Sequence, residues 1–177
     1  MKTFLLVLLS LAFLLVVAVA IVYAIGARLP VTHSVSVTGI VPASPARTLA
    51  IISNVGDGAA WRSEVKSVKV LPPEDGKDHW IEDLGRGMKM DFVATGTQPL
   101  SADGHAVRTI FLKDPNYGGT WTYDVSPGPS PNQTTLKITE DGFIHSPIYR
   151  FAMAHFFGPT RNLKIYIKDI QKKAAQS

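Results

Sequence analysis

One uninterrupted hydrophobic run near the N-terminus constrains this chain more than any other feature of its sequence. Phe4 to Ile25 contains no charged residue and a single serine. A helix of roughly 22 residues is about 33 Å long, enough to cross a hydrocarbon core of about 30 Å. We therefore predict that residues 1–27 form a transmembrane anchor and that residues 28–177 form one separate domain.

A cleaved signal sequence is the competing interpretation of this run. Signal cores are usually about 7–15 residues long and end at small residues, and Ala18-Val19-Ala20 would supply such a site. The run continues past that site to Ile25, so its length favours an uncleaved anchor. Lys2 and the free amine flank one end and Arg28 the other, and we expect the domain on the extracytoplasmic side.

Composition narrows the possible chemistry of the rest of the chain. The formal net charge is +4, and the charges are scattered, which indicates a solvated surface and no nucleic-acid partner. The chain has no cysteine, so disulfides, thiolate catalysis and cysteine metal sites are excluded. The histidines show no metal-ligand spacing, and we expect neither a metal nor a cofactor.

Alternation of apolar and polar residues follows the hydrophobic run. Val31 to Val41 alternates with a period of two, which predicts a strand. Ser44 and Pro45 then suit the cap and first position of a helix that leads to Trp61. Six further strands are predicted at Val65–Leu71, His79–Leu84, Met88–Thr95, His105–Lys113, Thr120–Val125 and Thr134–Thr139.

The C-terminal part of the chain has helical periodicity in two pieces. Ser146 and Pro147 are suited to start the first piece. Gly158-Pro159 interrupts the pattern, which predicts a kink or a break. The second piece carries apolar residues on one face and lysines mostly on the other.

The order of these elements predicts an α+β fold. Consecutive strands joined by short turns form an antiparallel sheet, which buries one face and needs a cover. The long C-terminal helix is the only large cover available, and a curved sheet gripping one helix leaves space for an apolar pocket.

Several segments together resemble the SRPBCC superfamily, also called START-like, which includes the polyketide cyclase/dehydrase-like proteins. They are Val31–Val41, Ala43-Ser44-Pro45 leading to Trp61, Trp80-Ile81-Glu82, Gly118–Tyr123, Thr135–Gly142 and Ser146–Gly158. The resemblance covers roughly residues 31–172 and implies a helix-grip fold. It is poorly specific for chemistry, because the superfamily spans lipid carriers, hormone sensors, cyclases and assembly factors.

Aromatic side chains supply the candidate ligand contacts. Trp121 and Tyr123 alternate with polar residues, so we expect them to face inward, where they would stack on a flat ligand or simply pack in the core. His155 falls on the apolar face of the first C-terminal helical piece. The predicted ligand-binding residues are Trp61, Trp80, Phe92, Trp121, Tyr123, Phe151 and His155.

Glu82 and His155 are the two candidates for acid–base catalysis. Trp80 and Glu82 share one face of their strand. On the concave face, Glu82 would be a buried carboxylate able to orient a ligand or act as a base. The alternative, which we favour, is an exposed Glu82 or one paired with a Lys or Arg, and a structural role for His155.

Three functions are compatible with this sequence. The first, which we favour, is a membrane-anchored protein that binds a lipid, quinone or polyketide-like ligand between sheet and helix. The second is a cyclase or dehydratase-like enzyme using Glu82 or His155. The third is an interaction module for a protein partner at the membrane.

Overall fold

The computed structural model describes residues 2–176. Its strands are β1 (Thr32–Val41), β2 (Ser67–Glu74), β3 (Lys77–Gly85), β4 (Met88–Gln98), β5 (Ala106–Leu112), β6 (Tyr117–Pro127) and β7 (Thr134–Ile144). Its helices are α1 (Lys2–Arg28), α2 (Pro45–Ser53), the 3-10 turn η1 (Val55–Asp57), α3 (Gly58–Trp61), α4 (Pro147–Ala152), the π-helical turn η2 (Met153–Phe157) and α5 (Arg161–Ala175). This order is the predicted one.

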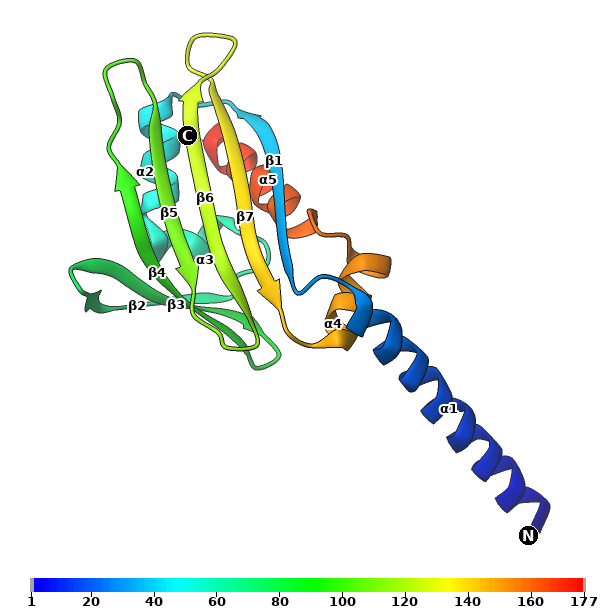
Figure 1. Cartoon of the computed structure of the whole chain (residues 1–177). Helices are drawn as coiled ribbons and strands as arrows, with labels where there is room; N and C mark the ends of the chain where they lie inside the picture. The colour runs from blue at the N-terminus through cyan, green and yellow to red at the C-terminus, as the bar shows by residue number, and fades with distance from the viewer. Residues whose placement is uncertain (1, 177) are drawn as a thin grey trace.

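The described strands form one curved antiparallel sheet of seven strands in the order β1-β7-β6-β5-β4-β3-β2. β2 to β7 follow one another through short turns, and β1 closes the sheet by pairing with β7, where Val37 lies opposite Ile138. Because strand side chains alternate, one face of the sheet collects the apolar positions of every strand. This is the predicted α+β helix-grip architecture (Figure 1).

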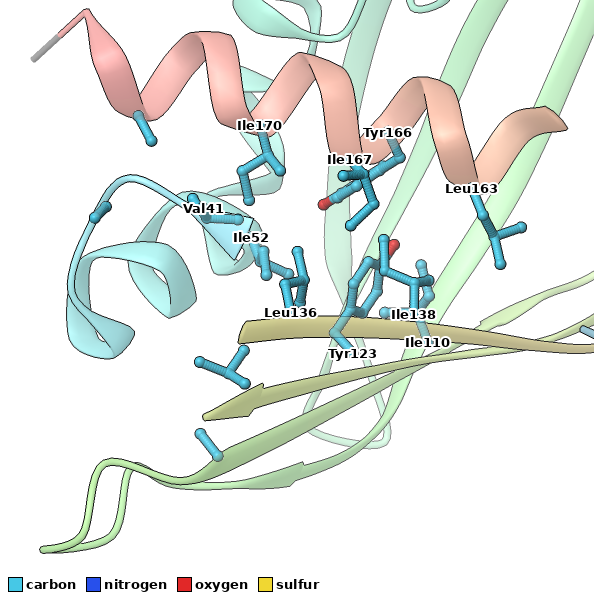
Figure 2. Close-up of a cluster of buried hydrophobic side chains, with 14 of the residues drawn as sticks. Val41, Ile52, Ile110, Tyr123, Leu136, Ile138, Leu163, Tyr166, Ile167 and Ile170 are labelled. Carbon is cyan, nitrogen blue, oxygen red and sulfur yellow. The ribbon is translucent and has the colours of Figure 1, made fainter. Parts of the chain in front are cut away.

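Helix α5 covers the concave face of the sheet. Its inner side chains Leu163, Tyr166, Ile167 and Ile170 point toward the sheet (Figure 2). They meet Leu136 and Ile138 of β7, which like Leu163 and Ile170 have no exposed surface. Burial of each such side chain stabilises the fold by about 1.5–3 kcal/mol. α5 is therefore held mainly by its apolar face.

Both predicted helix starts are confirmed. Ser44 caps α2, accepting a hydrogen bond from the Arg47 amide at 3.4 Å, and Pro45 is the first helical residue. Ser146 caps α4 in the same way, and Pro147 follows it. A serine oxygen satisfies an amide that has no partner inside the helix, and proline tolerates the first position.

The break at Gly158-Pro159 is also confirmed, but its effect is larger than a kink. Gly158 has φ +76°, a backbone conformation that ends η2, and α5 begins three residues later at Arg161. α4 and η2 lie beside the end of α1, away from the face that α5 covers (Figure 1). The C-terminal region therefore consists of two separate helical segments: α4 with η2 beside α1, and α5 on the concave face of the sheet.

α1 extends away from the domain (Figure 1). Within residues 2–176 it is the one helix long and apolar enough to cross a membrane, judged by length and composition, and a signal sequence passes the same test. Leu29 to Val31 is all that separates α1 from β1. Arg150 of α4 holds this junction: its Nε donates to the Gly26 carbonyl at 3.0 Å.

Candidate functional site

A small internal cavity lies between the sheet, α5 and the segment from α2 to α3. Its free volume is about 20 Å³. A cavity of roughly 10–15 Å³ holds one water molecule, so this space is small by the standard of ligand pockets. The lining residues are Ile52, Asn54, Val55, Gly58, Trp61, Arg62, Trp80, Glu82, Arg108, Ile110, Tyr123 and Tyr166.

An ion pair between Arg62 and Glu82 occupies one wall of the cavity. The Arg62 guanidinium donates to Glu82 Oε1, and the Trp80 indole N–H donates to the same oxygen at 3.1 Å. The side chain of Glu82 is only 4% exposed and that of Arg62 is 21% exposed. Glu82 is therefore both buried, as the catalytic interpretation required, and paired with an arginine, as the favoured alternative required.

The electrostatics of this pair keep a full positive charge inside the fold. Burial, the largest single effect, lowers the pKa of Arg62, but Glu82, Tyr166 and Tyr123 together outweigh burial, so the pKa of Arg62 is raised. The guanidinium also lies over the Tyr166 ring, 5.2 Å from its centroid. A cation above an aromatic face is attracted by the ring quadrupole, which adds to the ion pair.

Two tyrosine hydroxyls and a second arginine complete the polar lining. The Tyr123 and Tyr166 hydroxyls are hydrogen bonded to each other. Burial raises the pKa of Tyr166 to about 12 and the pKa of Tyr123 well above its usual value, so both stay protonated at neutral pH. Arg108, on β5, donates from one terminal nitrogen to Asp78 at 2.9 Å.

Two buried polar atoms in this site have no hydrogen-bond partner among the described residues. They are Glu82 Oε2, an acceptor, and Arg108 Nε, a donor. Buried polar groups without a partner cost about 1–3 kcal/mol each, and native structures contain few. Both residues line the cavity, and a polar group there with both donor and acceptor capacity would satisfy the two atoms.

Aromatic rings surround these polar atoms. The Trp61 ring packs edge-on against Tyr166 at 5.3 Å, and Tyr123 lies at the same distance from Tyr166. On the other side of the cavity Trp80 stacks on Phe92 at 5.5 Å. Such pairs add about 0.5–1.5 kcal/mol beyond their buried area, so these rings stabilise the closed arrangement of the cavity wall.

The structure brings most of the predicted ligand contacts together. Trp61, Trp80 and Tyr123 line the cavity. Phe92 backs Trp80, and Trp121 packs against Tyr166 at 6.2 Å, so both lie behind the lining. The cavity differs from the expected apolar pocket in one respect: the charged residues Arg62, Glu82 and Arg108 form part of its lining.

Phe151 and His155 do not belong to this site, and their assignment to it is corrected here. Both lie in the α4–η2 region, where their rings stack at 4.4 Å, and His155 is exposed. His155 Nδ1 hydrogen bonds to the Phe151 carbonyl at 2.9 Å. Helical periodicity placed both residues on one face of a helix, and their rings do lie together there. The chain changes direction at Gly158, so this helix face does not line the cavity.

Arg62, Arg108 and Tyr166 are the site residues that sequence reasoning missed as functional candidates. Tyr166 was expected on the inner face of its helix, which carried a signal for burial. Arg108 shares its strand parity with the buried Ala106 and Ile110, so parity marked its inward position. Arg62 carried no such signal, because it follows a single turn of helix.

A second titratable cluster lies further along the concave face. Glu140 of β7 accepts from His33 Nε2 of β1 at 3.4 Å and from the Trp121 indole. Burial raises the pKa of Glu140, and the contacts with His33 and Trp121 only partly counter this. Within residues 2–176, no group of three or more acidic or histidine side chains is arranged to hold a metal ion.

Comparison with known proteins identifies the fold but not the chemistry. No protein-family model matches the sequence, and no curated protein matches it. Solved structures do match. The Zhui aromatase/cyclase from Streptomyces sp. R1128 superposes with a TM-score of 0.62 at 13% identity, over 82% of this chain and 94% of that one.

Two further structures agree. A START superfamily protein from Mycobacterium smegmatis has a TM-score of 0.58 at 19% identity, over 81% of this chain and 98% of its own. Norcoclaurine synthase from Thalictrum flavum has a TM-score of 0.60 at 10% identity, over 83% of this chain and 88% of its own. At these identities the likeness shows the fold alone: the chain has the helix-grip fold of START-like and polyketide cyclase proteins, preceded by one long apolar helix.

Proposed function

We propose that this chain is a membrane-anchored binding protein for a small, mainly apolar ligand that carries one polar group. The observation that carries the proposal is the cavity itself, where Glu82 Oε2 and Arg108 Nε are unpaired inside a wall of aromatic rings. A phenolic or quinone-like head group offers a flat ring for stacking together with a donor or acceptor. α1 would keep the cavity near the bilayer, where such ligands partition.

Binding requires the cavity to widen. Typical ligand pockets measure about 300–1,000 Å³, far above the roughly 20 Å³ found here. One side of the cavity is formed by residues 52–62, which include a single 3-10 turn and a helix of four residues. Such short elements have few internal hydrogen bonds, so we expect this segment to move outward when a ligand enters.

The test is ligand capture by the full chain, purified gently from its host in detergent and analysed by native mass spectrometry. We expect a co-purifying apolar molecule with one polar group. Hydroxybenzaldehyde, which is bound in one norcoclaurine synthase structure, serves as a defined probe for titration followed by tryptophan fluorescence. An empty protein that also fails to bind phenolic probes would contradict the proposal.

Two variants sharpen this test. Glu82→Gln should weaken binding of the phenolic probe, because the amide is a weaker acceptor than the carboxylate and its NH2 group cannot accept a hydrogen bond. Lys89→Gln is the matched control, since Lys89 is exposed and points to the opposite face of the adjoining strand β4. Equal affinity of the two variants would remove Glu82 from the binding site. Trp121→Ala should also weaken binding while the domain stays folded.

Acid–base catalysis in the same cavity is the second candidate. The contact between Glu82 and the cavity favours it, since a carboxylate and two protonated tyrosines can exchange protons with a bound substrate. Prolonged incubation should then return a bound compound chemically altered by the wild-type chain and unaltered by Glu82→Gln. If the wild-type chain and the Glu82→Gln variant both return the compound unchanged, the cavity binds the compound without catalysing a reaction.

We also propose that the domain lies on the extracytoplasmic side. This orientation follows from Lys2 and the free amine at the other end of the apolar helix. Protease added to intact cells should then remove the domain. Full protection of the domain, with cleavage only after lysis, would reverse the orientation.

A further inference from the structure

Four large apolar side chains outside the domain core are strongly exposed on α4 and η2. Ile148 is 49% exposed, Tyr149 65%, Phe156 74% and Phe157 57%. We call these four residues the aromatic patch. Large exposed aromatic side chains gathered on one short segment are unusual for a surface that meets only water.

The aromatic patch is fixed beside the end of α1. A Cβ atom on Gly26 would lie 1.9 Å from the Pro147 carbonyl oxygen, so only glycine permits this approach of α1 to α4. Arg150, which is 8% exposed, donates to the carbonyls of Gly26, Ile144 and His145 at 2.8–3.0 Å. The patch therefore has a set position relative to the axis of α1 (Figure 1).

Charge in this region suits a lipid surface. No Asp or Glu occurs between Gly142 and Lys168 or at any position before Asp57. Arg28, at the end of α1, is exposed here. A cation at the end of a membrane helix is attracted to anionic lipid head groups, and aromatic side chains are enriched at the boundary between head groups and acyl chains.

We infer that the aromatic patch docks onto the bilayer surface at the point where α1 leaves it, so that two contacts, α1 and the patch, hold this end of the domain against lipid. The inference rests on the proposed membrane anchoring by α1. Lipid is the occupant we infer, because the patch lies directly beside the end of the apolar helix. If α1 crosses a bilayer, Gly26 and α4 lie at the level of the bilayer surface.

The test uses the absence of native cysteine. Single variants Tyr149→Cys and Phe157→Cys of the full chain are labelled with a nitroxide and reconstituted into vesicles of phosphatidylcholine and phosphatidylglycerol. Ser130→Cys, in the exposed β6–β7 loop at the opposite end of the domain (Figure 1), is the aqueous control, and Leu15→Cys in α1 is the lipid control. The ratio of collisions with oxygen to collisions with a water-soluble nickel chelate reports depth.

We expect this ratio to be several-fold higher at positions 149 and 157 than at position 130, approaching that at position 15. Patch labels that behave like position 130, while position 15 lies in lipid, would overturn the docking and leave the anchoring intact. An aqueous signal at position 15 would overturn the anchoring itself. Patch labels shielded from both reagents would overturn lipid docking in favour of a protein contact.

Discussion

Replacing Arg62 by methionine should destabilise the domain strongly, because it leaves the Glu82 carboxylate buried without its cation. Removal of one partner from a buried ion pair costs about 3–5 kcal/mol. The Glu82 side chain is 4% exposed, but that of Arg62 is 21% exposed. Water can therefore screen part of the loss, and we place the expected decrease in the free energy of unfolding near the lower end, about 3 kcal/mol.

The assay is urea unfolding of the full chain in detergent, followed by tryptophan fluorescence. The three tryptophans, Trp61, Trp80 and Trp121, all lie at or behind the cavity wall, so the signal reports this region. The double variant Arg62→Met with Glu82→Gln should recover a large part of the loss, because the uncompensated charge is gone.

Arg161→Met is the matched control for this substitution. Arg161 pairs with Glu64 at 2.9 Å, but the side chains are 49% and 38% exposed. Exposed pairs contribute about 0–1 kcal/mol, so the control should unfold close to the wild type. If Arg62→Met and the double variant lose equal stability, the buried charge is not the cause and the argument fails.

Three other perturbations test separate parts of the structure. Leu163→Ala, at a position with no exposure, should lower the free energy of unfolding by about 2–5 kcal/mol, whereas Val70→Ala, at 59% exposure, should change it little in the same urea titration. Gly26→Ala should cost about 1–3 kcal/mol through its clash with Pro147, and Gly56→Ala, whose nearest neighbour would be 3.7 Å away, should be close to neutral. Burial raises the pKa of Glu140, so the folded state binds the proton more tightly than the unfolded chain, and stability falls as pH rises above 4.5 through the raised value. Glu140→Gln should remove this fall in urea titrations between pH 4 and pH 7, and an unchanged pH profile would refute it.

The element order was predictable because most strands kept an apolar-polar alternation and because α2 and α4 each begin with a serine followed by proline. Val31–Val41 and Ser44-Pro45 are examples in which local physics and the final fold agree. Parity also placed Trp80 and Glu82 on one face of their strand, but it did not decide whether that face was the concave one.

Two features of the site could not be read in this way. Periodicity places Phe151 and His155 on a helix face but says nothing of the direction in which the chain continues after Gly158, which only the folded backbone decides. The buried arginines contradict the rule that Arg stays exposed, and pairing with Glu82 or Asp78 depends on contacts between residues 20 and 30 positions apart.

The short connection between α1 and β1 has a mechanical consequence. A domain on a long flexible tether samples a wide volume above its attachment point. Here only residues 29–31 separate α1 from β1, and Arg150 hydrogen bonds to the Gly26 carbonyl at this junction. If α1 tilts, the whole domain would therefore rotate with it as a rigid unit. If α1 crosses a membrane, as we propose, the domain would stand at a fixed height and angle above the bilayer, and a membrane-bound molecule would reach it only by diffusion in the plane of the membrane.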